Sequence, residues 1–335
     1  MKRLLLLCIT INLLISMSCW AENRSGEVTM EFDLSAQPAS QKVQLWIPYP
    51  VSNHDQLIGN IRLEGNYSSA GVYTVTTNGT PLLYAEWAQG SKSRKLSLAF
   101  DVTRDELRRG DFPVREPSWN PDDYAEYLAP TSIGPTDGAV KELSDKIVTG
   151  KVTVLERTKA IYDWTVENMY RDPETRGCGT GDVCYLLLKP GGKCTDISSV
   201  FVALCRAAGV PAREVFGLRL GKKAEQDITT WQHCWAEFFL PGHGWVPADP
   251  ADVLKAMLVE KIELTSPRII ELRDYFWGGV DAYRFQLASG RDLLLNPSQA
   301  GEPLNTFGYP YAETGGKALD FYDPKSFVYK FNYKE

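Results

Sequence analysis

The chain of 335 residues lacks two features: an apolar run long enough to cross a membrane, and a stretch rich in basic residues. A membrane-spanning helix needs about 20 apolar residues, and the N-terminal apolar run, residues 4–15, is shorter than that. Lys and Arg are scattered along the sequence, and the formal net charge is −6. Nucleic acids and anionic membrane surfaces bind concentrated basic faces. We therefore expect neither as a partner.

Signatures of metal binding are also missing. The sequence has only three histidines, and none of its seven cysteines forms the Cys-x-x-Cys pair that structural zinc sites favour. Its acidic residues do not form the Asp-x-Asp-x-Asp-Gly loop that is typical of calcium-binding EF-hands. We therefore expect no metal and no cofactor.

The N-terminus carries the pattern of an export signal. Lys2 and Arg3 precede the apolar run, and Cys19-Trp20-Ala21 resembles a cleavage site of small residues. This pattern predicts a signal peptide over residues 1–21, cleaved after Ala21, and a periplasmic or secreted protein with no transmembrane anchor after its removal. A lipoprotein modified at Cys19 is the alternative, although its −3 position holds Ser16 rather than the usual Leu.

Export limits the pairing of the remaining cysteines. Cleavage leaves five of them, an odd number, so at least one thiol stays unpaired in an oxidising compartment. These are Cys178, Cys184, Cys194, Cys205 and Cys234. Cys178 and Cys184 bracket the glycine-rich segment CGTGDVC, which predicts a disulfide between them.

The periodicity of apolar residues predicts an α+β protein preceded by an all-β domain. Short alternating stretches separated by Gly, Asn and Ser favour a β-sandwich-like domain over 22–115, with strands at 28–34, 43–48, 72–77 and 96–102. A segment rich in Pro, Asp and Tyr, 116–136, reads as a linker or strap. Helical periodicity follows at 139–147 and 154–169, and strands return from Pro211 onwards. We assign 116–275 to a catalytic α+β domain and 276–335 to a C-terminal β-rich extension packed on the core.

Cys194 occupies an unusual place for a cysteine. Apolar residues at helical spacing predict an amphipathic helix over 196–208, which ends at Gly209 before Pro211. Cys194 therefore lies in or just before the first turn, where free backbone N–H groups and the helix dipole favour an anion. A thiol there has a lowered pKa and becomes a nucleophile. The glycine pair before it, 191–192, allows a tight turn that leaves space above the sulfur. Cys205 fits a small buried hydrophobe instead.

A thiolate nucleophile needs a base, and the base needs an orienting group. His233 begins a predicted strand, whereas His54 and His243 lie in loop-like segments. Period 2 turns Cys234 to the opposite face, so we expect only His233 to face Cys194 and Cys234 to serve packing. Asp249 ends the next strand, where its carboxylate can hold the imidazole, and Asp252 is the nearby competitor. Three tryptophans near these residues are expected to pack in the core or to line an acyl cleft: Trp231, Trp235 and Trp245.

Two segments resemble the transglutaminase-like superfamily of papain-fold proteins, and in particular its secreted bacterial members: GGKCTDISSVFVALCRAAGVPAREVFGLRL and WQHCWAEFFLPGHGWVPADP. The resemblance covers about 124–252. It implies a core in which N-terminal helices precede a nucleophile helix packed on an antiparallel sheet. It also implies Cys194 as nucleophile, His233 as base, Asp249 as the acid of the triad, and acyl transfer through a thioester. The Cys194 backbone N–H is the first expected oxyanion donor, and the second is not assigned.

The function hypothesis is an exported cysteine-dependent enzyme that hydrolyses an amide or peptide bond. Its expected partner is a protein or peptide substrate, with a cell-wall peptide as one candidate. Two alternatives stay open: a non-catalytic binding or assembly module of the same fold, and a true transamidase.

Overall fold

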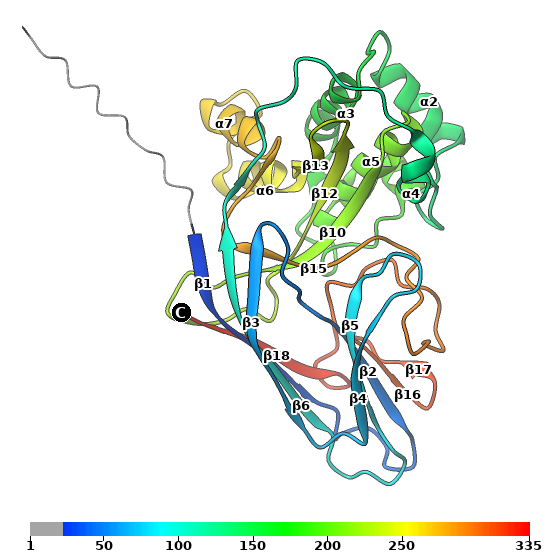
Figure 1. The fold of residues 1–335 in the computed structure, drawn as a ribbon, viewed down its shortest axis with the longest axis vertical. Helices are drawn as coiled ribbons and strands as arrows, with labels where there is room; N and C mark the ends of the chain where they lie inside the picture. The colour runs from blue at the N-terminus through cyan, green and yellow to red at the C-terminus, as the bar shows by residue number, and fades with distance from the viewer. Residues whose placement is uncertain (1–22) are drawn as a thin grey trace, which may run out of the picture.

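The computed structural model describes residues 23–335. The predicted signal peptide, its cleavage after Ala21 and the alternative lipid site at Cys19 lie outside these residues. The described chain forms a β-sandwich next to a helical α+β domain (Figure 1). The expected fold class, an α+β core preceded by an all-β sandwich-like domain, is confirmed.

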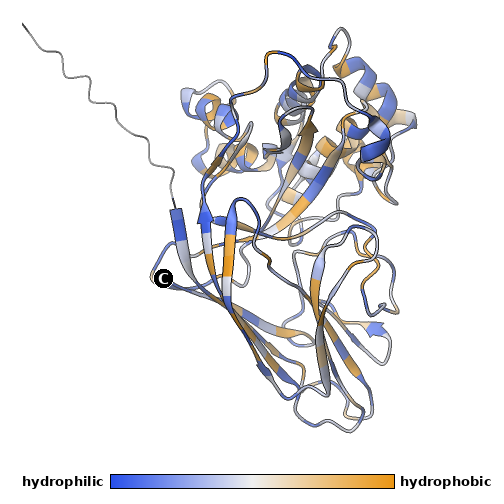
Figure 2. Ribbon diagram, in the orientation of Figure 1, coloured by the Kyte–Doolittle hydropathy of each residue, from blue (hydrophilic) through white to orange (hydrophobic). Residues whose placement is uncertain are grey.

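The sandwich consists of two five-stranded antiparallel sheets. The first has the strand order β11 (Glu225–Asp227), β18 (Val328–Lys334), β1 (Asn23–Asp33), β6 (Lys95–Asp105) and β3 (Gln56–Gly65). The second has the order β17 (Lys317–Ala318), β16 (Tyr311–Thr314), β2 (Val43–Pro48), β5 (Pro81–Trp87) and β4 (Ser69–Thr74). Hydrophobic and hydrophilic residues alternate along the long strands (Figure 2). Val28, Met30 and Phe32 of β1 therefore share the buried face between the sheets.

Strands from the C-terminus complete both sheets of the sandwich. β18 pairs antiparallel with β1, from Glu27↔Lys334 to Asp33↔Val328, and β16 pairs with β2. The segment 276–335, which was expected as one extension, is thus shared between the domains, because β15 (Arg284–Ser289) lies in the four-stranded sheet of the α+β domain. The limits of the domains, at 115 and 275, stay a prediction.

A four-stranded antiparallel sheet forms the centre of the α+β domain, in the order β13 (Gly244–Ala248), β12 (Gln232–Leu240), β10 (Ala212–Arg219) and β15. The helix α5 (Cys194–Ala207) packs on β12 and β10, and all its residues are buried. Three helices pack against α5 in turn: α2 (Gly138–Ile147), α3 (Val154–Asn168) and α4 (Val183–Leu188). In Figure 1 these helices lie on one side of the strands.

Two further helices, which the sequence pattern did not indicate, follow β13: α6 (Pro250–Glu260) and α7 (Pro267–Tyr275). In Figure 1 they lie beyond β13, and α6 packs against α5 and α3. The strap at 116–136 contains η1 (Pro121–Tyr124) and α1 (Ala125–Leu128). Two short ladders remain: β7 (Leu107–Arg108) with β14 (Gly279–Val280), and β8 (Tyr170–Arg171) with β9 (Gly191–Gly192). Within residues 23–335, no helix has both the length and the apolar character that a membrane crossing requires.

Candidate active site

Helix α5 begins at Cys194, and hydrogen bonds hold its first turn on both sides. The Asp196 carboxylate accepts a hydrogen bond from the backbone N–H of Lys193 at 3.1 Å. The same carboxylate accepts from the N–H groups of Thr180 at 3.0 Å and Gly181 at 2.7 Å, which brings the 177–181 loop against the helix. An acid in the first turn also matches the positive end of the helix dipole. Asp196 therefore fixes where the helix starts.

The glycine pair before Cys194 serves close packing rather than a tight turn. Gly191 and Gly192 form strand β9, which pairs in parallel with β8 so that Arg171 lies opposite Gly192. A Cβ on Gly192 would come within 2.5 Å of the Asp196 Cβ. The expected space above the sulfur is thus better described as room for Asp196, and a larger residue at 192 would displace the helix start.

The loop at 177–181 carries a second cysteine to the nucleophile. The Thr195 N–H, one of the free donors of the first helical turn, donates to the Cys178 carbonyl at 2.9 Å. Cys178 is buried, whereas Cys184 lies on α4 and is exposed, and both are free thiols. The predicted disulfide between them is therefore wrong. Between the two cysteines the chain turns at Gly179, whose φ is +95°, and this turn separates the side chains of Cys178 and Cys184.

Three thiols gather at this point. The sulfur atoms of Cys178, Cys194 and Cys234 lie within 4.8 Å of one another, and all three residues are buried. The expectation that Cys234 would point away from Cys194 is wrong. Cys234 faces α5, with its sulfur 3.3 Å from the Thr195 hydroxyl. Cys194 shares a cleft with Gln232, so it lies beside the start of β12, where side chains from both faces of the strand can reach it.

The structure also brings together His233 and Asp249. The His233 Nε2 lies 2.7 Å from the Asp249 Oδ2, and both side chains are buried. Asp249 is the N-cap of α6, with Pro250 in the first helical turn, and its Oδ1 accepts from the Asp252 N–H at 2.9 Å. One carboxylate oxygen therefore caps a helix while the other faces the imidazole. This leaves the second ring nitrogen, Nδ1, for Cys194.

A buried arginine that the sequence did not reveal completes the cluster. Arg284, on β15, has no exposed surface and forms ion pairs with Asp249, with Asp281 at 3.1 Å and with Asp252 at 3.7 Å. Its Nη1 lies 3.0 Å from the His233 Nε2. Two N–H donors cannot bond each other, so both groups donate to the shared Asp249 oxygen. No local motif marks Arg284, because β15 follows the recognised segment.

Charges in the cluster favour a thiolate beside an imidazolium. Hydrogen bonds from the Cys178 and Cys234 thiols hold the pKa of Cys194 well below its ordinary value, and His233 adds to this effect against the opposing effect of burial. The hydrogen bond with Cys194 raises the pKa of Cys178, so that neighbour stays protonated. Burial and Arg219 lower the pKa of His233, but Asp252 and Asp249 outweigh them and raise it. Cys194 therefore loses its proton before the imidazolium does.

Cys194 and Cys178 line a cleft of about 460 Å³. One wall comes from the C-terminal segment and is aromatic, with Tyr309, Phe321, Tyr322, Phe327 and Tyr329. Of the three tryptophans, Trp235 stacks on His233 with ring centroids 6.4 Å apart, and Trp245 packs on Tyr127 away from the cleft. Trp231 lines a neighbouring hollow. The core-packing interpretation therefore fits Trp235 and Trp245.

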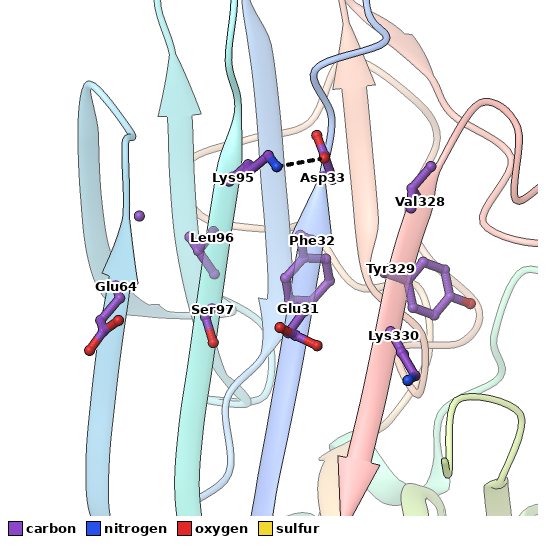
Figure 3. A pocket seen from close by; sticks show the side chains of 11 residues that line it. Glu31, Phe32, Asp33, Glu64, Lys95, Leu96, Ser97, Val328, Tyr329 and Lys330 are labelled. Carbon is purple, nitrogen blue, oxygen red and sulfur yellow. Dashed lines mark ion pairs between the residues drawn. The ribbon is translucent and has the colours of Figure 1, made fainter.

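A hollow of similar size, about 470 Å³, lies on the sandwich between β1, β6, β3 and β18 (Figure 3). Its charged residues include the ion pair between Lys95 and Asp33, at 3.3 Å. Its lining contains no cysteine and no histidine. It therefore lacks the cysteines, Cys178 and Cys194, that line the other cleft.

Among residues 23–335, two groups offer ligand atoms close enough for a metal: the three sulfurs of Cys178, Cys194 and Cys234, and the group of His233, Asp249 and Asp252. The carboxylates of the second group are already neutralised by Arg284 and by Arg219, which lies 2.6 Å from Asp252. A cation there would have to displace a guanidinium. The absence of a metal stays a prediction.

Known proteins resemble this chain over the same region. Residues 141–250 match the family model of the transglutaminase-like superfamily. An uncharacterized protein of Haemophilus influenzae is 38% identical over an alignment of 334 residues. The match covers 91% of this chain and 90% of that protein. The uncharacterized protein YebA of Bacillus subtilis is 29% identical over 125 residues, 33% of this chain and 17% of YebA.

A solved structure from Cytophaga hutchinsonii, proposed to be a cysteine protease, covers 94% of this chain and 100% of its own, with a TM-score of 0.54 and 16% identity. At this identity the likeness concerns the fold. The family model, the long match to the Haemophilus protein and the fold agree. The chain belongs to the transglutaminase-like superfamily.

Proposed function

We propose that this protein is an exported cysteine-dependent acyl-transfer enzyme that hydrolyses an amide or peptide bond through a thioester on Cys194. The observation that carries the proposal is the buried series from Cys194 to His233 to Asp249, with 2.7 Å between the imidazole and the carboxylate. The lowered pKa of Cys194 beside the raised pKa of His233 supports a reactive ion pair.

In the first half-reaction the Cys194 thiolate attacks the carbonyl carbon and forms a C–S bond. The His233 imidazolium gives its proton to the amine as the C–N bond breaks, which leaves a thioester. Water then attacks the thioester while His233 takes its proton, and the acid departs as Cys194 regains its negative charge. Asp249 orients the ring and stabilises its charged form throughout.

The developing oxyanion needs preorganised donors. The Cys194 backbone N–H lies in the first turn of α5, where helix geometry provides no acceptor for it. We assign it as the first donor. Burial of Cys194, which is 2% exposed, keeps the site in a medium of low dielectric constant, where such donors act strongly.

The experiment uses the mature protein, a tryptic peptide mixture and water enriched in heavy oxygen, with Cys194→Ala as the matched control. Hydrolysis places heavy oxygen in new carboxyl termini, or in Glu formed from Gln, and mass spectrometry detects it. We expect this label with the wild-type protein and not with the variant.

A labelled primary amine added to the same mixture separates the alternatives. Amine incorporation without heavy oxygen would identify a transamidase and replace the hydrolytic proposal. No product across a broad peptide mixture, with Cys194 also unreactive toward iodoacetamide, would favour a binding or assembly module instead.

A further inference from the structure

A second hollow opens beside the Cys194 cleft. Its volume is about 420 Å³, and the two hollows share Arg171, Thr230 and Gln232 in their linings. They therefore form a continuous surface with Cys194 at one part and the second hollow at another. A substrate held at Cys194 would extend along this surface, either toward the aromatic wall of the Cys194 cleft or into the second hollow.

The linings are strongly basic although the chain as a whole has a formal net charge of −6. Together the two hollows contain five basic residues and one acidic residue, Asp281. The basic residues, scattered along the sequence, are Arg171, Lys193, Arg219, Lys222 and Lys255. Arg219 is neutralised by Asp252 at 2.6 Å and Asp281 at 3.8 Å. No acidic residue of the lining pairs with the other four cations, so the lining carries an excess of positive charge.

Arg171 and Lys255 are among the cations that are partly buried and have no hydrogen-bond or ion-pair partner for the side chain within residues 23–335. The Arg171 Nη1 is buried and makes no hydrogen bond. The Lys255 side chain makes neither a hydrogen bond nor an ion pair within residues 23–335. Burial and Arg219 lower its pKa, while Asp252 and, to a smaller extent, the Cys194 thiolate act to raise it. A buried donor without a partner costs free energy that a bound acceptor would restore. Both groups are therefore suited to an anion.

The backbone holds these two cations in place. Arg171 belongs to β8, whose ladder with β9 sets it opposite Gly192, two residues before Cys194. Lys255 belongs to α6, which begins at Asp249 and packs against β8. Helix α6 thus provides both an N-cap for the proposed triad and a cation for the second hollow.

We propose that Arg171 and Lys255 form an anion-binding subsite that selects acyl substrates with a carboxylate close to the scissile amide. The inference rests on the proposed function and narrows it to acidic peptides. Lys193 and Lys222 add positive charge at the borders of the subsite. The aromatic wall on the other side of Cys194 would contact the apolar part of the same peptide.

The test requires no natural substrate. Iodoacetate and iodoacetamide alkylate a thiolate in the same way, but only iodoacetate carries a carboxylate. We expect the ratio of their rates at Cys194 to be higher than at the exposed Cys184, and to fall about fivefold in Lys255→Met or Arg171→Gln. Lys92→Gln, in the sandwich, removes one exposed charge as the matched control and should leave the ratio unchanged.

The iodoacetamide rate separates the two proposals. An unchanged iodoacetamide rate with a reduced iodoacetate rate supports the subsite, because the nucleophile is intact. Equal ratios in the wild-type protein and both variants, with fast iodoacetamide labelling, would overturn the subsite and leave the proposed function standing. Slow labelling by iodoacetamide in the folded wild-type protein would contradict the proposed function instead.

Short peptides then identify the source of the carboxylate. Ala-Glu-Ala amide offers a side-chain carboxylate, Ala-Gln-Ala acid offers a terminal one, and Ala-Gln-Ala amide offers none. Protection of Cys194 from iodoacetamide by either of the first two, lost in Lys255→Met, supports the subsite and names the group recognised. Equal protection by all three would overturn it.

Discussion

The two domains each bury one arginine completely, and the two side chains are used differently. Arg94, in the sandwich, donates to the backbone carbonyls of Gln37 at 2.6 Å, Pro38 at 3.2 Å and Gln41 at 3.1 Å. Arg284, in the catalytic domain, faces three carboxylates and the His233 ring. Arg94 fixes a loop, whereas Arg284 sets the charges of a cluster.

This contrast extends to the rest of each domain. The buried Arg104 of the sandwich likewise donates to a backbone carbonyl, that of Asp55, at 2.7 Å. At one end of the four-stranded sheet, buried titratable side chains instead contact one another, and the pKa of Cys194 is lowered while that of His233 is raised. Titratable groups shifted in this way are typical of functional sites. The comparison predicts that polar substitutions in the sandwich affect stability alone.

The largest expected difference is between two histidines. Replacing His233 by Ala removes the cation beside Cys194, so the pKa of Cys194 rises and less thiolate is present at pH 6. The iodoacetamide labelling rate at pH 6 should fall roughly 100-fold, because the full charge of a buried imidazolium stabilises a thiolate more than a hydrogen bond from a neutral thiol does. His54→Ala, at an exposed position of the sandwich, should leave the rate unchanged.

Circular dichroism of both histidine variants serves as the control for folding. An equal labelling rate in folded His233→Ala and wild-type protein would mean that the imidazole does not activate Cys194.

The two buried arginines provide the second comparison. Arg284→Met removes the guanidinium that Asp249, Asp252 and Asp281 share. Arg219 still pairs with Asp252 and Asp281, but Asp249 loses its arginine partner, so the free energy of unfolding should fall by about 3–5 kcal/mol. Arg94→Met leaves only carbonyls unsatisfied and should cost about 1–3 kcal/mol. Urea unfolding at pH 7 measures both.

The same pair differs in its response to acid. Burial would raise the pKa of Asp252, but Arg219, His233 and Arg284 hold it well below its ordinary value. A lowered carboxylate pKa stabilises the fold above the unfolded pKa, and this stability is lost as the pH falls through the folded pKa. Arg284→Met should therefore unfold at a higher pH during acid titration than wild type, whereas Arg94→Met should show no comparable shift. Equal shifts would contradict the assigned difference.

Much of the catalytic domain could be predicted because its signals are local. The helical spacing after Cys194 and the alternation around His233 place both residues on α5 and β12, as observed. The sandwich was harder: β3 and β5 were not expected, and the C-terminal strands were expected to pack on the core rather than to complete the sandwich. Partners such as β1 and β18 are separated by about three hundred residues, and strand pairing across such a distance leaves no local signal.

The errors at the site have the same cause. The spacing of Cys178 and Cys184 suggested a pair, but the 177–181 loop is held by Asp196, which lies on another element. Arg284, Arg171 and Lys255 come from three separate elements, and only the folded chain brings them beside Cys194. A sequence shows which residues could react, and the fold determines what surrounds them.

The smallest expected effect separates two buried cysteines. Cys178→Ala removes a thiol that donates to Cys194, so the pKa of Cys194 should rise and labelling at pH 6 should fall about threefold. Cys205 lies in the same helix as Cys194 but outside the group of three sulfurs. Cys205→Ala creates a similar small cavity and should leave the labelling rate unchanged. Equal losses in both variants would mean that packing of α5, rather than a hydrogen bond to sulfur, sets the reactivity. Because neither variant removes His233, a selective loss in Cys178→Ala would assign to the loop at 177–181 a share in activating the nucleophile.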